Sequence, residues 1–441
     1  MLIEYSVENF NSFKSDTTLS MVMAKSFKEH LDTNVKKIDE KLSLLKSAIL
    51  YGNNASGKSN LLKSMRFMKR TILSSFKEAL SEETDKKFDI SKFELDVDSR
   101  SKGSSFECSF ILNQKKYRYG FELGEKTILS EWLFSTDKRE SSLFIRENQQ
   151  FSVNKLKFKE AVGREEDVRD NVLLISYLAS INKPISTEIV NWFKNFNVIN
   201  GIHDRGHKDF TITNLKDNKD FIKWAIKFVE FLDISNISTQ EEIFEEKNLE
   251  DIKKSVNDED MINVLTGTQK IQSRSPKRDK IVTYHKVYNK KNMLVDTIAF
   301  DFDKRESKGT KKLLYLLGPW YDTLVNGKVL AVDEIDSRLH SLLTSKLIEY
   351  FHETNTNNAQ LICATHDTSL LNRELFRRDQ IWFVDKNQFG LSHLISLAEF
   401  KSNVVRNKSA FSKNYLSGKY GSIPYFNSKM ELPERSLDSH A

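Results

Sequence analysis

The chain has 441 residues, 39% of them hydrophobic, and a formal net charge of +6. Its length suggests two or three domains, and its apolar content is enough for a substantial core. The small charge excess permits a nucleic-acid partner without indicating one, because clustered basic residues identify such proteins better than net charge does. No apolar run approaches the roughly 20 residues that cross a bilayer, and no signal peptide is visible, so we expect a cytoplasmic protein without membrane contact. Cys108 and Cys363 lie in separate apolar stretches and are expected to be buried and reduced.

The N-terminal segment alternates polar and apolar residues. Ile3, Tyr5 and Val7 are interleaved with polar residues, which predicts a strand, and a second strand is expected near 18–23. Residues 43–51 have the composition of a buried strand, and this strand leads directly into a loop that contains glycine. From Asn60 to about Ala79 the apolar residues recur at helical spacing.

The rest of the chain divides into three stretches. Residues 104–135 read as a β-meander, because apolar residues alternate along each run and turn residues separate the runs. Residues 170–275 are rich in charge and read as mainly helical, with an acidic run at 241–251. Beyond them we expect alternating strands and helices: strands near 281–301, 328–333 and 359–365, and helices at 309–317 and 339–352.

The loop after the first buried strand has the spacing of a phosphate-binding loop. Gly52–Ser59 fits G-x-x-x-x-G-K-[ST] at every position. Glycines allow backbone N–H groups to turn towards phosphates, Lys58 would reach the terminal phosphates, and Ser59 would ligate Mg²⁺. The helix that follows would place its partly positive N-terminus beneath the same anion. The sequence therefore predicts ATP and Mg²⁺ bound by Gly52, Asn53, Asn54, Ala55, Ser56, Gly57, Lys58 and Ser59.

Two later strands end in polar side chains. The apolar run 328–332 leads into Asp333 and Glu334. Such a strand end is common on its own, but together with a phosphate loop it predicts that Asp333 holds Mg²⁺ through water and that Glu334 is the general base. His366 follows another apolar strand, and because ligands bind at the carboxyl ends of strands in open α/β sheets, we expect it to contact the γ-phosphate.

Several segments together resemble the ABC/SMC-type ATPases. They occur in the family's order: Asn9-Phe10-Asn11-Ser12-Phe13, the loop continued through Asn60, Glu306-Ser307-Lys308-Gly309-Thr310, Asp333-Glu334 and Ala364-Thr365-His366. More narrowly, the chain is similar to the bacterial abortive-infection ATPases related to RloA and AbiL. Its segment Tyr415–Tyr425 resembles the C-terminal ending of that group. The resemblance implies an α/β fold with an ABC-type ATPase core of mixed sheet and flanking helices, an antiparallel β-meander and a helical insertion.

The resemblance also assigns roles to individual positions. Ser307 and Gly309 align with the signature segment that caps the γ-phosphate bound by the other subunit, and Asn60 belongs to the nucleotide-binding set. Residues 336–340 fall where the family has its inter-subunit loop. The family's usual glutamine cannot be placed, with Gln114 and Gln149 as weak candidates.

The family further implies an ATPase that acts as a homodimer, or a higher homo-oligomer, with ATP sandwiched between subunits. In the abortive-infection group such a switch controls a separate nuclease-like effector in anti-phage defence. The resemblance divides the chain into an N-terminal core part at 1–170, an insertion at 171–280, a C-terminal core part at 281–430 and a flexible tail at 431–441.

Two other functions are compatible with a nucleotide site. A RecF/SMC-like ATPase that clamps DNA is the main alternative, although 195–280 lacks the sustained heptads of an SMC arm. A transporter subunit fits poorly, because the signature segment departs from the transporter pattern.

Two further clusters favour a structural role. Asp301 and Asp303 have the spacing of a nuclease metal pair, but no acidic strand accompanies them, and we expect a solvated strand end. A solvent-exposed face is also the expected role of a basic cluster formed by Arg274, Lys277, Arg278 and Lys280, with a phosphate-contacting patch as the alternative.

Overall fold

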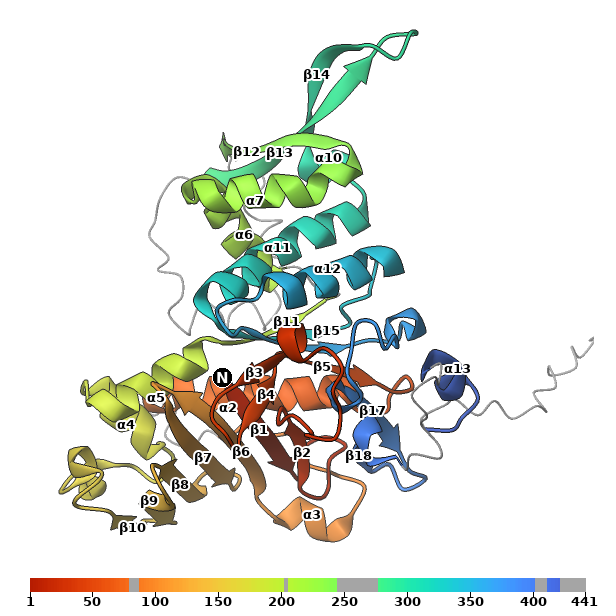
Figure 1. The fold of residues 1–441 in the computed structure, drawn as a ribbon. Helices are drawn as coiled ribbons and strands as arrows, with labels where there is room; N and C mark the ends of the chain where they lie inside the picture. The colour runs from red at the N-terminus through yellow and green to blue at the C-terminus, as the bar shows by residue number, and fades with distance from the viewer. Residues whose placement is uncertain (79–86, 202–204, 244–276, 401–410, 421–441) are drawn as a thin grey trace, which may run out of the picture.

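The computed structural model describes residues 1–78, 87–201, 205–243, 277–400 and 411–420. It has an α/β fold in which two large sheets and several helices form successive layers (Figure 1). The fold class expected from the sequence is confirmed: a mixed sheet with flanking helices lies beside an antiparallel meander. The expected tail at 431–441, most of the acidic run at 241–251, and Arg274 lie outside the described residues.

The first large sheet is antiparallel and has seven strands in the order β10-β9-β8-β7-β6-β1-β2. The meander predicted at 104–135 forms the centre of this sheet. Its apolar side chains at alternate positions face the same side of the sheet, as the alternation in the sequence predicts. The strands are β1 (Leu2–Glu8), β2 (Thr17–Ser20), β6 (Ser104–Leu112), β7 (Lys115–Leu123), β8 (Ile128–Thr136), β9 (Glu140–Glu147) and β10 (Gln150–Val153).

The second sheet has six strands in the order β11-β15-β16-β5-β17-β18. The first five are parallel, and β18 is antiparallel to β17. Three central strands, β5, β15 and β16, are buried at every residue, which explains why they read as continuous apolar runs. The bounds are β5 (Ser47–Tyr51), β11 (Phe196–Asn200), β15 (Val329–Asp333), β16 (Gln360–Ala364), β17 (Ile381–Lys386) and β18 (Ser392–Ser396).

Helix α2 (Lys58–Glu78) lies between the two sheets, and α4 (Leu174–Ser180) and α5 (Pro184–Lys194) pack against it. Its buried stripe includes Leu61, Met65, Met68 and Ile72, as the helical spacing predicts. One hydrophobic core fills the space between the sheets. A second core covers the opposite face of the six-stranded sheet, where Figure 1 shows α6 (Arg205–Asp217), α7 (Lys219–Val229), α11 (Lys308–Asn326) and α12 (Ser341–Thr354).

A buried ion pair connects the antiparallel sheet to α4. Glu131 on β8 and Arg146 on β9 are both fully buried, and their nearest charged atoms lie 3.7 Å apart. The Glu131 carboxylate also accepts the backbone N–H groups of Leu174 at 2.8 Å and Ile175 at 3.3 Å. Because Leu173, the N-cap residue, provides no side-chain cap, Glu131 satisfies the first amides of this helix from the neighbouring sheet.

A third sheet lies at the far end of the molecule, in the order β12-β13-β14. Its strands are β12 (Ile234–Ile243), β13 (Lys277–Tyr288) and β14 (Leu294–Asp301), and the β13–β14 hairpin projects away from the other layers (Figure 1). The shorter elements are α1 (Leu31–Asn34), β3 (Val35–Lys37), β4 (Ser43–Leu45), α3 (Val97–Ser101), α10 (Phe302–Arg305) and α13 (Phe411–Leu416).

Two details differ from the sequence expectations. The strand expected at 43–51 is interrupted at Lys46, so that β4 pairs with β3 while β5 enters the parallel sheet. The stretch 171–280 contains the expected helices but also β11, which joins the six-stranded sheet, and β12. Part of this stretch thus belongs to the six-stranded sheet. The domain boundaries expected from the sequence stay a prediction.

Candidate functional site

The loop Gly52–Ser59 connects β5 to α2 at the carboxyl end of the parallel strands. Both of its glycines are required by close packing. A Cβ at Gly52 would lie 2.2 Å from the Val384 carbonyl oxygen, and a Cβ at Gly57 would lie 2.3 Å from Ser392 Oγ. Gly57 also has φ +119°, a conformation that other residues rarely adopt. The glycines thus allow the loop to fold tightly against β17 and β18.

Two serines outside the loop hold it in place. Ser392 N donates to the Ser12 carbonyl oxygen at 2.8 Å, and Asn60 Nδ2 donates to Ser12 Oγ at 2.8 Å. Ser392 Oγ also contacts the Ser56 carbonyl oxygen. These bonds join the turn after β1 and the start of β18 to the loop. Ser392 was not identified from the sequence, because nothing in the residues around it marks a contact more than 300 positions away.

The Lys58 side chain folds back over the loop. Its Nζ donates to the carbonyl oxygens of Gly52 at 2.6 Å and Asn53 at 3.0 Å. Burial lowers the pKa of Lys58 to about 8, and the nearby carboxylates, with Asp333 the strongest, oppose this shift. The ammonium group is therefore held inside the loop, close to the acidic edge of the sheet.

Asp333 is the last residue of β15 and Glu334 follows it, as predicted. Asp333 is 8% exposed, and its Oδ1 has no hydrogen-bond partner among the described residues. Ser56 Oγ in the loop is likewise buried without a partner. Unpaired buried oxygens are costly unless a ligand or an ion satisfies them. The Asp333 carboxylate and the Ser59 hydroxyl, in the first turn of α2, are oxygen ligands of the kind that fit Mg²⁺. The Ser56 hydroxyl, the loop amides and Lys58 are donors of the kind that fit phosphate.

The backbone at Glu334 turns sharply away from the strand, with φ +50°. Lys312 Nζ from α11 donates to the Glu334 carbonyl oxygen at 2.8 Å. Non-glycine residues at positive φ are uncommon, and at functional sites they often serve to aim a side chain. The turn allows the Glu334 side chain to leave the sheet at the edge where the phosphate loop lies.

His366 follows β16 at the same edge. Its backbone N–H donates to Asp336 Oδ2 at 3.3 Å, and its Nδ1 lies 3.5 Å from Lys58 Nζ. Burial, followed by the charge of Lys58, lowers the pKa of His366. The imidazole is therefore neutral near pH 7 and can donate or accept a hydrogen bond beside Lys58. The structure thus places Lys58, Asp333, Glu334 and His366 within one region.

The expected signature residues lie at the start of α11. Ser307 is its N-cap, accepts the Thr310 N–H at 3.1 Å and is exposed. A Cβ at Gly309 would lie 2.7 Å from the Arg338 carbonyl oxygen, in the loop 336–340. The signature segment therefore lies against the expected inter-subunit loop of its own chain, and Ser307 is exposed although its hydroxyl caps the first turn of α11.

Sequence reasoning missed two residues at this edge. Asn200 ends β11 directly opposite Asp333, and Gly201 N donates to the Asp333 carbonyl oxygen at 2.7 Å. The available signal was the short run Phe-Asn-Val-Ile-Asn before a glycine at 196–201, which is hard to recognise as a strand because the surrounding stretch is mainly helical. The glutamines considered from the sequence lie elsewhere: Gln114 is in the turn between β6 and β7, and Gln149 contacts Arg146 at 3.2 Å.

The acidic pair considered as a decoy has structural partners. Asp301 caps α10, and Asp303 accepts the Tyr315 hydroxyl at 2.6 Å and pairs with Lys208 at 2.8 Å. Among the described residues, no group of three or more His, Cys, Asp or Glu side chains could hold a metal ion. The basic residues Lys277, Arg278 and Lys280 lie at the start of β13.

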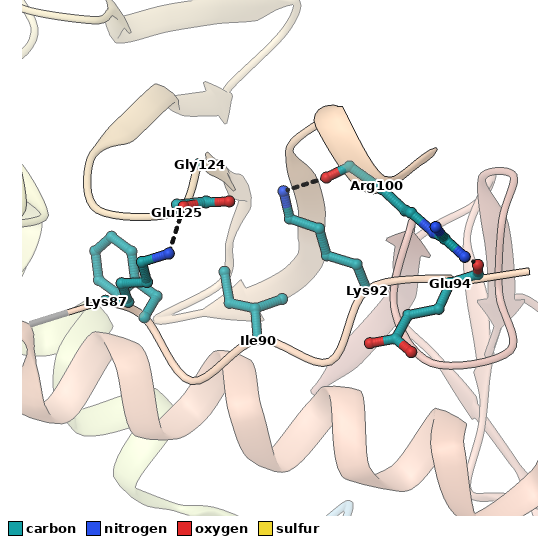
Figure 2. A pocket seen from close by; sticks show the side chains of 8 residues that line it. Lys87, Ile90, Lys92, Glu94, Arg100, Gly124 and Glu125 are labelled. Atoms are coloured by element: carbon teal, nitrogen blue, oxygen red, sulfur yellow. Dashed lines mark hydrogen bonds and ion pairs between the residues drawn. The ribbon is translucent and has the colours of Figure 1, made fainter. Parts of the chain in front are cut away.

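A surface pocket of about 420 Å³ lies away from this edge, beside the β7–β8 turn (Figure 2). Its basic side chains already have partners: Lys87 pairs with Glu125 at 2.9 Å, and Arg100 Nε donates to the Glu94 carbonyl oxygen at 3.0 Å. Lys92 Nζ donates to the Arg100 carbonyl oxygen at 3.2 Å. These groups are exposed and already bonded, so we assign no ligand to this pocket.

The loop, the carboxylates and the parallel strands define the class of protein: a nucleotide-binding P-loop ATPase domain. The family model described as "AAA domain, putative AbiEii toxin, Type IV TA system" matches residues 47–372, and the chain belongs to this family. The match spans both the phosphate loop and the carboxylate strand.

Two solved structures resemble the chain weakly. The SMC head domain from Thermotoga maritima is 13% identical with a TM-score of 0.40, and the match covers 90% of this chain and 98% of that one. The SmcHead bound to the C-winged helix domain of ScpA is 12% identical with a TM-score of 0.37, covering 90% and 97%. No curated protein matches the chain. In the part of the chain that the structure describes, no helix is both long and apolar enough to span a membrane.

Proposed function

We propose that this protein binds ATP with Mg²⁺ and hydrolyses it at the edge where β5, β15 and β16 end. The proposal depends on one observation: four polar side chains lie close together where three parallel strands end. They are Lys58, which begins the helix after β5, Asp333 and Glu334 at the end of β15, and His366 after β16. Ligands bind at the carboxyl ends of such strands, and the loop supplies the amides and the cation that phosphates require.

The residues divide the chemistry between them. The loop 52–59 and Asn60 hold the phosphates, with Lys58 as the cation. Ser59 and Asp333 would hold Mg²⁺, which when bound supplies positive charge to the phosphate oxygens. Glu334 accepts a proton from the attacking water, and neutral His366 hydrogen-bonds the terminal phosphate.

We further propose that hydrolysis is coupled to dimerisation. Ser307 is exposed at the N-terminus of α11, a position that suits contact with an anion held by another molecule. ATP bound between the loop of one copy and Ser307 and Gly309 of a second would then favour a closed homodimer. Because the nucleotide contacts both copies, its hydrolysis would release them, which makes the chain a two-state switch.

The biological role that fits this switch is anti-phage defence, in which the protein controls a separate nuclease-like effector. The family description, which names a putative AbiEii toxin and a type IV toxin–antitoxin system, supports a defence setting. The separate effector is the part of this proposal that rests on the resemblance to the abortive-infection ATPases. The narrower RloA/AbiL grouping is part of this proposal.

The decisive experiment compares the solution mass of Glu334→Gln with and without ATP–Mg²⁺ by size-exclusion chromatography with light scattering. The amide cannot accept the proton of water, so ATP should bind, persist and shift monomer to dimer. Lys58→Ala is the matched control, because it removes the cation that faces the phosphates and should show neither binding nor a shift. Full turnover in Glu334→Gln, or ATP binding without any change of mass or of hydrodynamic radius, would refute the proposed switch.

A further inference from the structure

Lys312 on α11 is almost completely buried, and the chemistry proposed above gives it no role. Its exposed fraction is 1%, compared with 5% for Lys58 and 8% for Lys46, the other lysines that are buried in the part of the chain that the structure describes. Burying an ammonium group is costly unless it is hydrogen-bonded, and an apolar side chain of similar length would fill the same space without that cost. The contacts of the Lys312 ammonium group therefore need an explanation.

The ammonium group holds the backbone of the proposed general base. Lys312 Nζ donates to the Glu334 carbonyl oxygen at 2.8 Å, and the Ser337 N–H donates to the same oxygen at 3.1 Å. Both bonds fix the turn that begins at Glu334, where the backbone has φ +50°. A residue other than glycine keeps this conformation only when its surroundings fix it. Because the backbone of Glu334 sets the direction in which its carboxylate leaves the strand, Lys312 helps to aim that carboxylate.

The helix that carries Lys312 begins at the signature segment. Ser307 caps α11, and Lys312 lies five residues further on, about 7.5 Å along the helix axis at 1.5 Å per residue. The first turn also touches the loop that follows Glu334, because a Cβ at Gly309 would lie 2.7 Å from the Arg338 carbonyl oxygen. The start of α11 is thus joined to the turn after β15 both at Gly309 and at Lys312, so a shift of the helix would move that turn.

The rest of α11 is packed closely enough to move as one body. Figure 1 shows it beside α6 and α7, with which it is in contact. Thr211 Oγ1 on α6 donates to the Tyr315 carbonyl oxygen at 2.7 Å, and a Cβ at Gly318 would lie 2.2 Å from the same Oγ1. Close-packed interiors transmit a displacement, because they have no free volume in which to absorb it. A displacement of the helix at Ser307 would therefore reach Lys312.

We propose that Lys312 is a positioning residue that couples the contact of Ser307 with one ATP to the orientation of Glu334 towards another. The inference rests on the proposed function, in which Ser307 of one copy meets the ATP in the loop of a second copy, while Glu334 acts on the ATP held by its own loop. In such a dimer, α11 and Lys312 connect the two nucleotides through one chain. Each ATP is then hydrolysed efficiently only while the other is in place.

Replacing the ammonium group tests this role. Lys312→Met removes the donor and keeps most of the side-chain volume, so turnover at saturating ATP should fall roughly tenfold or more, because a charged hydrogen bond to the Glu334 turn is lost. The dissociation constant of a non-hydrolysable ATP analogue should change by less than about twofold, since the phosphate loop is untouched. Lys312→Gln should show the same separation of turnover from binding, and it serves if Lys312→Met does not fold.

Lys46→Met is the matched control. Lys46 is also buried, and its Nζ also donates to a backbone carbonyl oxygen, that of Asn355 at 3.1 Å. It lies just before β5, at the opposite end of this strand from the phosphate loop. The control should therefore lose thermal stability to a similar extent while turnover stays at the wild-type value. A loss of turnover in both variants would show that Lys312 acts only through stability, and it would overturn the inference.

A double-mutant cycle with Ser307→Ala tests the coupling itself. If Lys312 transmits the contact at Ser307, the double variant should be about as slow as the slower single variant, because the second change interrupts a connection that is already broken. Losses that multiply would show that the two residues act independently and would overturn the coupling, as would wild-type turnover in Lys312→Met. A wild-type protein that binds no ATP analogue would instead refute the proposed function, and the inference with it.

Discussion

Nucleotide affinity should depend on pH through Lys58. The free protein holds this ammonium group between two loop carbonyls, and burial lowers its pKa to about 8. A bound phosphate would stabilise the charged form and raise the pKa again. Binding is then accompanied by proton uptake wherever the solution pH lies between the pKa values of the free and bound states.

The size of the effect follows from the pKa of the free state. Below about pH 8, Lys58 is already charged and the affinity should be constant. At pH 9, one unit above that pKa, about one molecule in eleven carries the charge, so the dissociation constant should rise about tenfold, or about 1.4 kcal/mol. The affinity should therefore fall by about a factor of ten for each further unit of pH, until the pKa of the bound state is reached.

Isothermal titration calorimetry with a non-hydrolysable ATP analogue, from about pH 7 to about pH 9.5, measures both the affinity and the proton uptake. Lys69→Met is the matched control. Lys69 lies about three turns further along the same helix, with a pKa that burial also lowers to about 8, but it donates to the Lys194 carbonyl oxygen and to Asn197 Oδ1 instead of to the loop. Its removal should leave the pH profile unchanged. An affinity that stays constant through pH 9 in the wild type would refute the assignment of Lys58 as the phosphate-binding cation.

Two further outcomes are expected from the packing. Gly201→Ala would place a Cβ 2.4 Å from the Glu334 carbonyl oxygen and 2.5 Å from that of Asp333, so it should cost about 1–3 kcal/mol in thermal unfolding and reduce hydrolysis more than nucleotide binding. His352 is buried against Ser47, and burial lowers its pKa from 6.5 to about 3. Between pH 6.5 and about 3, the unfolded chain therefore binds one more proton at His352 than the folded chain does. This group should lower the free energy of unfolding by about 1.4 kcal/mol for each unit that the pH drops in that range. His207, whose pKa burial lowers to about 4, contributes to the slope as well, so His352→Gln should reduce the slope measured by urea unfolding by about 1.4 kcal/mol per pH unit and not abolish it. The same slope in the variant and the wild type would contradict the assigned burial.

The sequence predicted the positions of the central elements well because their signals are local. The loop 52–59 is a contiguous pattern whose residues act together, and β15 and β16 are buried on both faces and so read as apolar runs. Because ligands bind at the carboxyl ends of parallel strands, the polar residues after each run, Asp333 and His366, could be expected to meet. The structure places both beside Lys58.

Residues that reach the site only through chain folding could not be predicted in the same way. Ser392 contacts the loop from more than 300 positions away, and Asn200 reaches Asp333 because β11 pairs with β15 across an intervening stretch of more than 100 residues. Neither residue has a neighbouring pattern that indicates its partner, since polar residues at strand ends are common in any sheet.

The sequence by itself determined the class of fold, the phosphate loop and the strand-end carboxylates, since each depends on the order and spacing of neighbouring residues. Only the tertiary structure decided which distant serines support the loop and which strand lies beside Asp333. It also decided that β14 (Leu294–Asp301) is exposed along most of its length, whereas β5, β15 and β16 are buried. The physical reason is that local spacing specifies an element and its apolar positions, whereas long-range packing determines which other segments of the chain lie against it.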